Sequence, residues 1–112
     1  MKIKTSDLIG SALDWAVAKC ERVLPCTYDD WCQVWPFYST NWSQSGPIIE
    51  REKIDCMADP NGKDVWMGQL YATRLAGNKV VRAYGPTPLV AAMRCYVASK
   101  LGNEVDIPEE LL

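Results

Sequence analysis

The residue types that most often carry out chemistry are scarce in this chain of 112 residues, which contains no histidine and five cysteines. Histidine is the usual general base near neutral pH, the commonest metal ligand and a member of most nucleophilic triads. Cys20, Cys26, Cys32, Cys56 and Cys95 include no C-x-x-C pair, and zinc bound without histidine would need four thiolates. We therefore expect no metal, no cofactor and no hydrolase of the usual kind.

The carboxylates do not supply a catalytic group in place of histidine. They occur singly or as adjacent pairs, such as Asp29 with Asp30 and Glu109 with Glu110. No pair is arranged for general acid–base catalysis. The sequence therefore predicts that the protein is not an enzyme.

Arg94 is a lone fixed charge in the middle of an apolar stretch. An arginine buried without a partner is costly, so it must pair with a carboxylate, reach water or bind an anion. The first interpretation is a structural ion pair, for which the candidate partners are Glu50, Glu52 and Asp14. The second interpretation is a binding site for a small anionic ligand or nucleic acid, formed by Arg94, Trp42 and the Gly46–Pro47 turn.

Aromatic residues are concentrated between residues 28 and 42, where six of the eleven in the chain occur. One interpretation is that the rings anchor a long loop to a small core. The other is that some rings stay exposed and bind a partner. The candidate aromatic residues for binding are Trp35, Tyr38, Trp42 and Trp66. Nucleic acid is disfavoured at this segment, because no Lys or Arg occurs between Val23 and Glu50, so a protein or small-ligand contact is the better functional interpretation.

Charge and hydropathy argue against two classes of partner. The net charge is −2 with the two signs interspersed, so the sequence carries no electrostatic footprint for duplex DNA. No apolar stretch approaches the length needed to span a bilayer, and the first residues do not resemble a signal peptide. An odd number of cysteines favours reduced thiols in a cytoplasm. The acidic residues after Lys100 predict a solvated terminus, namely Glu104, Asp106, Glu109 and Glu110.

The first half of the chain predicts a short edge strand at Met1–Lys4 and two helices. Apolar periodicity indicates a helix over about residues 6–22. A second, short helix is predicted over residues 45–53, with Pro47 near its first position. A short strand around residues 33–38 is a further expectation.

The second half of the chain carries the clearest local signals. Alternating apolar and polar residues predict a β-hairpin over about residues 64–84, with its loop near 74–78. A helix follows over residues 88–101, with Thr87 and Pro88 at its start and Gly102 just after its end.

These elements predict an α+β fold in a single domain, residues 1–112, with two main helices packed on a small antiparallel sheet that contains the hairpin. The last helix is apolar nearly all round. It should therefore be covered on more than one side, by the sheet and by the first helix or a second subunit. A homodimer is thus one expectation.

Three segments in order along the chain resemble the NinX-like proteins of lambdoid bacteriophages and enterobacterial prophages. They are residues 4–19, which include LDWAVAK, residues 38–51, which read YSTNWSQSGPIIER, and residues 85–102, which begin GPTPL. Asn41 and Ser45 stand where the family commonly has Asp and Gly, so an acid beside Trp42 is not a required catalytic group.

The family is a domain of unknown function, so the resemblance implies an origin and a location without a mechanism. We expect an accessory protein of a phage or prophage that lies in the cytoplasm of the bacterial host. Its expected function is binding of a host or phage protein through the aromatic-rich loop. The alternative is the anion or nucleic-acid site at Arg94.

Overall fold

The structure is a computed structural model, which describes residues 1–22, 37–59, 61–62, 65–72 and 79–111. Some of the sequence predictions concern residues outside the described ranges. These predictions are the strand near residues 33–38, of which most is not described, the hairpin loop near 74–78, and the roles of Trp35, Cys26 and Cys32.

The described chain forms three α-helices, five strands and two short 3₁₀ helices, which confirms the α+β fold class. In chain order they are β1 (Lys2–Lys4), η1 (Thr5–Asp7), α1 (Gly10–Cys20), α2 (Trp42–Glu52), β2 (Asp55–Ala58), β3 (Trp66–Ala72), β4 (Lys79–Gly85), α3 (Pro88–Leu101), β5 (Glu104–Asp106) and η2 (Glu109–Leu111). The predicted hairpin is confirmed as the antiparallel pair β3–β4, to which β2 adds in the order β2-β3-β4.

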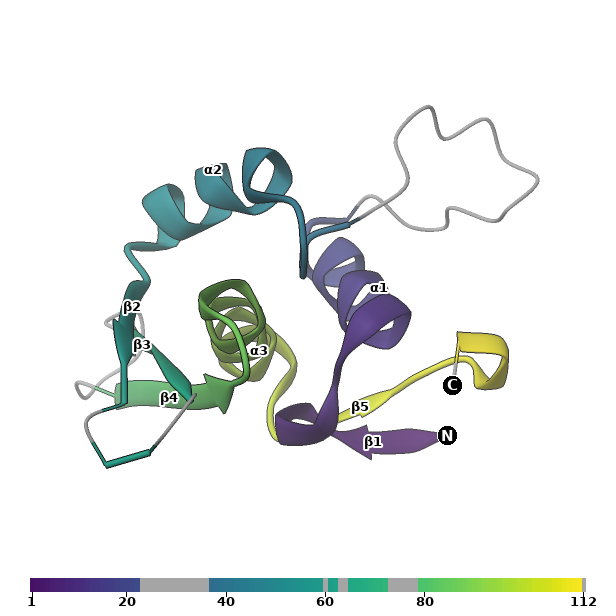
Figure 1. Cartoon of the computed structure of the whole chain (residues 1–112). Coiled ribbons are helices and arrows are strands. Elements are labelled where there is room, and N and C mark those ends of the chain that lie inside the picture. Colours follow the sequence, from purple (N-terminus) through teal and green to yellow (C-terminus); the bar gives the residue numbers. More distant parts are fainter. Residues whose placement is uncertain (23–36, 60, 63–64, 73–78, 112) are drawn as a thin grey trace.

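Helix α3 lies at the centre of the molecule, between the three-stranded sheet and α1 (Figure 1). The detail of two helices on the sheet needs correction, because α3 packs directly on β2, β3 and β4 whereas α1 packs on α3. The side chains from Leu89 to Val97 are buried except for Arg94. The chain's own elements therefore account for the apolar sequence of this helix without a second subunit.

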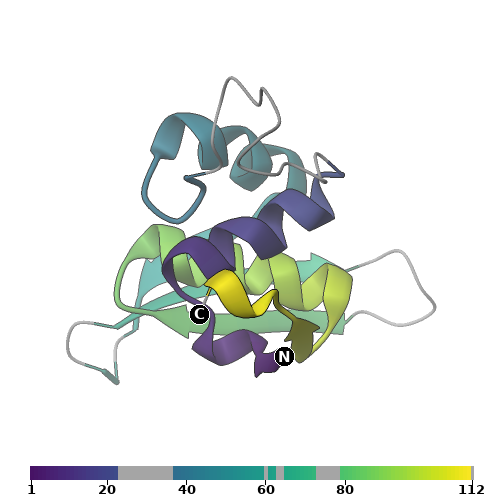
Figure 2. The same cartoon turned by 90° about the vertical axis from the view of Figure 1, so that its right-hand side faces the viewer.

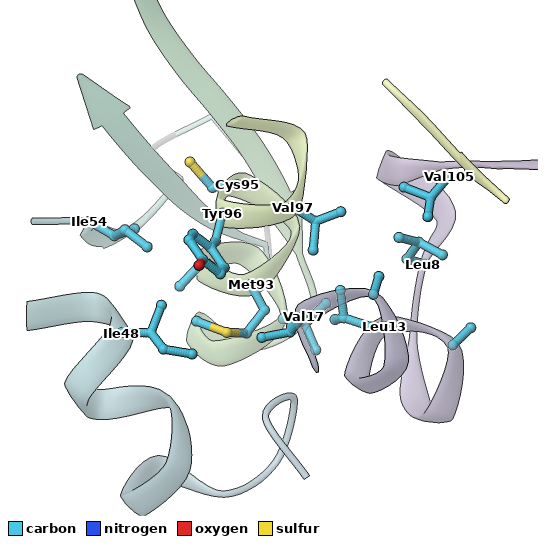
Figure 3. Close-up of a cluster of buried hydrophobic side chains, with 14 of the residues drawn as sticks. Leu8, Leu13, Val17, Ile48, Ile54, Met93, Cys95, Tyr96, Val97 and Val105 are labelled. Atoms are coloured by element: carbon cyan, nitrogen blue, oxygen red, sulfur yellow. The ribbon is translucent and has the colours of Figure 1, made fainter. Parts of the chain in front are cut away.

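Side chains leave α3 in several directions to reach the rest of the core (Figure 3). Tyr96 lies on the side of Ile48 and Ile54, and Val97 lies on the side of Leu8 and Val105. All six side chains are at most 6% exposed. One helix thus connects α2, the sheet and the terminal strands in a single apolar cluster.

Helix α3 begins and ends at the residues that the sequence predicts, Pro88 and Leu101. Thr87 is the N-cap, and its Oγ1 accepts a hydrogen bond of 3.1 Å from the backbone N–H of Val90. Pro88 is the first helical residue, where a missing N–H costs nothing. Gly102 follows the helix with a φ of 86°, in the region that favours glycine.

Two glycines of the sheet allow α3 to approach very closely. A Cβ atom at Gly68 would lie 2.7 Å from the carbonyl oxygen of Ala91, and one at Gly85 would lie 2.9 Å from the Ala91 nitrogen. Real Cβ atoms do not come this close to backbone atoms, so the observed packing requires glycine at both positions.

The predicted helix at residues 6–22 begins later than expected. Thr5–Asp7 form a 3₁₀ turn, Leu8 is extended, and α1 starts at Gly10, whose φ is 60°. Leu8 is fully buried and its carbonyl accepts a hydrogen bond from the Arg94 side chain instead of a helical N–H. A tertiary contact therefore overrides the local helical pattern.

The predicted short helix at residues 45–53 begins earlier than expected. The prediction of a turn at Gly46–Pro47 is therefore wrong. Helix α2 starts at Trp42, because the Asn41 side chain caps it by accepting a 2.9 Å hydrogen bond from the Ser43 N–H. Gly46 and Pro47 both lie inside the helix.

An ion-pair cluster holds α2 against the ends of α1 and α3. The Arg51 guanidinium donates two hydrogen bonds to the Glu21 carboxylate, at 3.1 and 2.7 Å, and the Tyr96 hydroxyl donates another at 2.6 Å. Burial alone would raise the pKa of Glu21, but these hydrogen bonds and the nearby positive charges lower it.

The sequence predicts a solvated terminus for the acidic C-terminal segment, and this prediction is wrong for residues 104–106. Residues 104–106 form strand β5, which pairs antiparallel with β1, and the two strands lie side by side (Figure 2). Val105 and Ile107 are buried while Glu104 and Asp106 stay exposed. The alternation of charged and apolar residues in this segment is that of a strand with one buried face, and β5 forms a two-stranded sheet with β1.

The packing of α3 gives a direct stability prediction. Gly68→Ala should lower the free energy of unfolding by about 1–3 kcal/mol, because the new Cβ overlaps the Ala91 carbonyl and forces the helix away from the sheet. Urea unfolding measures this loss.

The matched control for this prediction is Gly46→Ala. Gly46 lies within α2, and a Cβ there would meet no atom within 4 Å. This variant should be neutral or more stable by about 0.5–1 kcal/mol. Equal stability of the two variants would show that α3 does not lie as close to the sheet as the structure places it.

Candidate functional site

A pocket of about 660 Å³ lies where the edge of the sheet meets α3 and the terminal strands. Three cations line it, Lys4, Arg82 and Arg94, together with one carboxylate, Glu104. We call it the basic pocket. Its local excess of positive charge stands out in a chain with a net charge of −2.

Three separate parts of the fold position these cations. Arg82 is on β4, which ends the order β2-β3-β4 and so presents an edge with no paired strand among the described residues. Lys4 is at the end of β1, which is held in place by its pairing with Glu104 in β5. Thr5 continues this attachment, since its N–H donates to the Asn103 carbonyl at 2.8 Å and its hydroxyl to the Gly102 carbonyl at 2.6 Å.

Arg94 joins the three parts through backbone carbonyls. Its Nε donates a 2.7 Å hydrogen bond to the carbonyl of Leu8, and its Nη1 donates another of 2.7 Å to the carbonyl of Tyr84. It forms no ion pair with a carboxylate of the described residues. Partial burial lowers the pKa of Arg94, and the charge of nearby Asp7 opposes this shift. An arginine nevertheless stays charged at neutral pH.

The predicted ion pair of Arg94 with Glu50, Glu52 or Asp14 is therefore wrong. Glu52 pairs with Arg51 and Lys100, both at 3.3 Å. Asp14 accepts a 2.7 Å hydrogen bond from the backbone N–H of Ser39. Glu50 is exposed on α2 and forms no ion pair with any described residue.

The structure also does not bring Arg94 together with Trp42, Gly46 and Pro47. These three residues belong to α2, and none of them lines the basic pocket. Sequence reasoning singled out Arg94 but missed Lys4, Arg82 and Tyr84. The alternation in the hairpin does place Arg82 and Tyr84 on the same face of β4, but nothing local indicates that β1 and α3 meet that strand.

The aromatic candidates are distributed between the core and the surface. Trp35 lies outside the described residues. Tyr38 is half-buried and packs against the core, and burial together with the charges of Glu21 and Asp14 raises its pKa. Trp66 is half-buried at the start of β3, whereas Trp42 is 55% exposed.

The described thiols do not resemble catalytic nucleophiles. Cys20, Cys56 and Cys95 are free, and burial is the main cause that raises the pKa of Cys20 and of Cys95 to about 12. These thiols are therefore protonated at neutral pH, and a thiol is a poor nucleophile. Among the described residues, no cluster of three or more potential ligands could hold a metal ion.

None of the described helices has both the length and the apolar character that crossing a membrane requires.

The fold and the site together define a small α+β protein with a basic pocket in which backbone carbonyls hold Arg94 in place. The family model described as Bacteriophage P22, NinX matches residues 4–100, and the chain therefore belongs to this phage family. This confirms the resemblance and identifies a phage accessory protein. The comparison with curated proteins gave no match.

The buried carboxyl of Asp14 predicts a dependence of stability on pH. Burial raises its pKa, although the hydrogen bond from the Ser39 backbone N–H opposes this effect. An acid whose pKa is raised by folding contributes most to stability below its unfolded value, near 3.8, and this contribution is lost as the pH rises through the folded value.

Asp14→Asn tests this prediction, because the amide oxygen keeps an acceptor for Ser39 but cannot ionise. The free energy of unfolding of the wild type, relative to this variant, should fall as the pH rises above the unfolded pKa, near 3.8. Urea unfolding at a series of pH values from acid to neutral measures the difference. A difference that is constant or grows with pH would contradict the assignment.

Proposed function

We propose that this phage protein is a non-enzymatic binding protein that takes an anionic ligand in the basic pocket. The observation that carries the proposal is the state of Arg94. Its charge is partly removed from water, its hydrogen bonds to the described residues go to the Leu8 and Tyr84 carbonyl oxygens, and it lines a pocket that two further cations also line.

The energetics of Arg94 favour an anion as its missing partner. The charge of nearby Asp7 favours the guanidinium but makes no ion pair with it, and the carbonyl dipoles orient it without neutralising it. A partly desolvated charge with no directly bound counter-ion is unfavourable. The guanidinium also has further N–H donors beyond the two that bind Leu8 and Tyr84. A phosphate or carboxylate would accept these as charge-assisted hydrogen bonds.

The size and composition of the basic pocket also fit a bound ligand. Its volume of about 660 Å³ lies within the range of small-molecule sites. Val65, Pro86 and Ala98 supply apolar wall, and Asn103 supplies an amide. Such a mixture favours a ligand with a flat or apolar body and an anionic group, rather than a bare ion.

Inorganic phosphate is the simplest probe of this proposal. Added to the full chain, it should shift the backbone amide NMR signals of Thr5, Tyr84 and Asn103, with a dissociation constant of about millimolar because only one ionic group is recognised. A titration with chloride at equal ionic strength removes general salt effects.

Two lysines of β1 provide a matched pair of variants for the same titration. Lys4→Gln should weaken phosphate binding severalfold, whereas Lys2→Gln should not, because Lys2 is exposed on the same strand but does not line the pocket. Equal binding by both variants, or shifts centred on α2, would refute the proposed site.

A second candidate function is binding of a host or phage protein through exposed rings at the start of α2. Phe37 is 48% exposed and Trp42 is 55% exposed. The turn between them is ordered, because the Phe37 carbonyl accepts hydrogen bonds from the N–H groups of Thr40 and Asn41. Exposed rings on an ordered turn are typical of interface hot spots. Both proposed functions place the protein in the host cytoplasm. The free thiols of Cys20, Cys56 and Cys95 support that location, because cytoplasmic proteins keep their cysteines reduced.

Trp42→Ala separates the two interpretations of this ring. The substitution should change the free energy of unfolding by no more than about 0.5 kcal/mol, since the ring is exposed, while removing capture of a partner protein from host lysate. Tyr38→Ala should instead lower stability, because Tyr38 packs on the core. If Trp42→Ala unfolds the protein or leaves capture unchanged, the protein-binding function is wrong.

A further inference from the structure

The three-stranded sheet has one face that no described element covers. Gly68 and Gly85 face α3, so the residues that alternate with them point to the opposite side. In Figure 1 the described helices do not cover that side. We call it the outer face, and its side chains are Asp55, Met57, Met67, Gln69, Tyr71, Val80, Arg82 and Tyr84.

The outer face carries several of the large apolar side chains that are exposed among the described residues. Four of the eight large hydrophobic side chains that are exposed among the described residues lie on it: Met57 at 39%, Tyr71 at 55%, Val80 at 38% and Tyr84 at 47%. Scattered exposed apolar residues need no explanation, but a group on one sheet face marks an interaction surface.

A hydrogen-bonded chain orients the polar groups of this face. The Arg82 Nε donates to the Gln69 side-chain oxygen at 2.8 Å, and the Gln69 amide donates to the Tyr71 hydroxyl at 2.6 Å. Gln69 itself is only 7% exposed. The Tyr71 ring and the Arg82 guanidinium are therefore held in position while the ring remains open to solvent.

The outer face is continuous with the basic pocket, because Arg82 and Tyr84 belong to both. The positive charges, Lys4, Arg82 and Arg94, gather at the β4 edge, and Asp55 lies across the sheet on β2. An anionic chain would therefore run along the β4 edge, where phosphates meet cations, and would leave its apolar parts on the tyrosines.

We propose that the basic pocket and the outer face together bind single-stranded nucleic acid, with backbone phosphates at Arg94 and Lys4 and bases stacked on Tyr84 and Tyr71. This proposal rests on the anion-binding function proposed above and names its ligand class. Base stacking on exposed aromatic rings beside a cationic path is how proteins bind single strands without reading their sequence.

The sheet geometry limits the length of strand that the site accepts. Tyr71 lies opposite Val80, and Tyr84 is four residues further along β4, which is about 14 Å at about 3.4 Å per residue. One base cannot stack on both rings, so a mononucleotide would use only part of the site.

Fluorescence anisotropy with labelled oligothymidylates and the full chain tests the proposal at low salt. Affinity should rise from thymidine 3′,5′-bisphosphate to oligomers of about eight nucleotides and then level off. Duplex of the same length should bind more weakly, because its bases are not available to the tyrosines.

Substitutions at Tyr84 test stacking at one position. Tyr84→Leu should weaken oligothymidylate binding at least about fivefold, whereas Tyr84→Phe should retain it, since the phenyl ring still stacks. Lys4→Gln should reduce the slope of log affinity against log salt by about 0.7, the value for one phosphate contact on a single strand, and Lys2→Gln should not change it.

The outcomes distinguish this proposal from the pocket on which it rests. If phosphate binds the pocket but oligomers bind no more tightly than the bisphosphate, or if Tyr84→Leu and Tyr84→Phe bind equally, the nucleic-acid proposal is wrong and the anion pocket stands. If neither phosphate nor oligomer binds, both are wrong. If a protein captured from lysate protects the outer face while oligomers do not bind, the face is a protein interface and the proposal is overturned.

Discussion

The close approach of α3 to the sheet is the constraint on which the other features depend. Glycine at positions 68 and 85 leaves no side chain between the helix backbone and the strands. At this separation the Arg94 side chain can bind the Tyr84 carbonyl at the sheet edge and the Leu8 carbonyl beyond the helix at the same time. That bridge connects the extended segment before α1 to the edge of the sheet, and Arg94 itself forms part of the basic pocket.

The bridge fixes the Arg94 side chain, but no carboxylate of the described residues forms an ion pair with it. The carbonyl oxygens satisfy hydrogen-bond donors of Arg94 and hold its guanidinium in one orientation, yet they carry no net charge to oppose it. By contrast, the exposed Arg51 of α2 pairs with both Glu21 and Glu52. In the function that we propose, Arg94 meets an anionic group from outside the chain, and Lys4 and Arg82 line the same pocket.

Local signals in the sequence were enough to predict the elements that local chemistry determines. Helix α3 has a threonine cap, a proline at its first position and a glycine after its end, and the β3–β4 hairpin has clear alternation. The start of α1 could not be predicted, because a side chain 86 residues away binds the Leu8 carbonyl. The pairing of β1 with β5 also joins the two ends of the described chain. The candidate site shows the same limit: Arg94 was recognisable as an unusual charge, but its companions come from β1 and β4, which only the fold brings to it.

The proposed binding mode requires the guanidinium of Arg94 to receive an anionic group of a bound single strand. The most direct measurement is a crystal structure of the full chain with a short oligothymidylate. We expect a phosphate within hydrogen-bond distance of the Arg94 guanidinium and the Lys4 ammonium group, with a base stacked on the Tyr84 ring. A strand bound elsewhere on the protein, with the basic pocket free of phosphate, would contradict it.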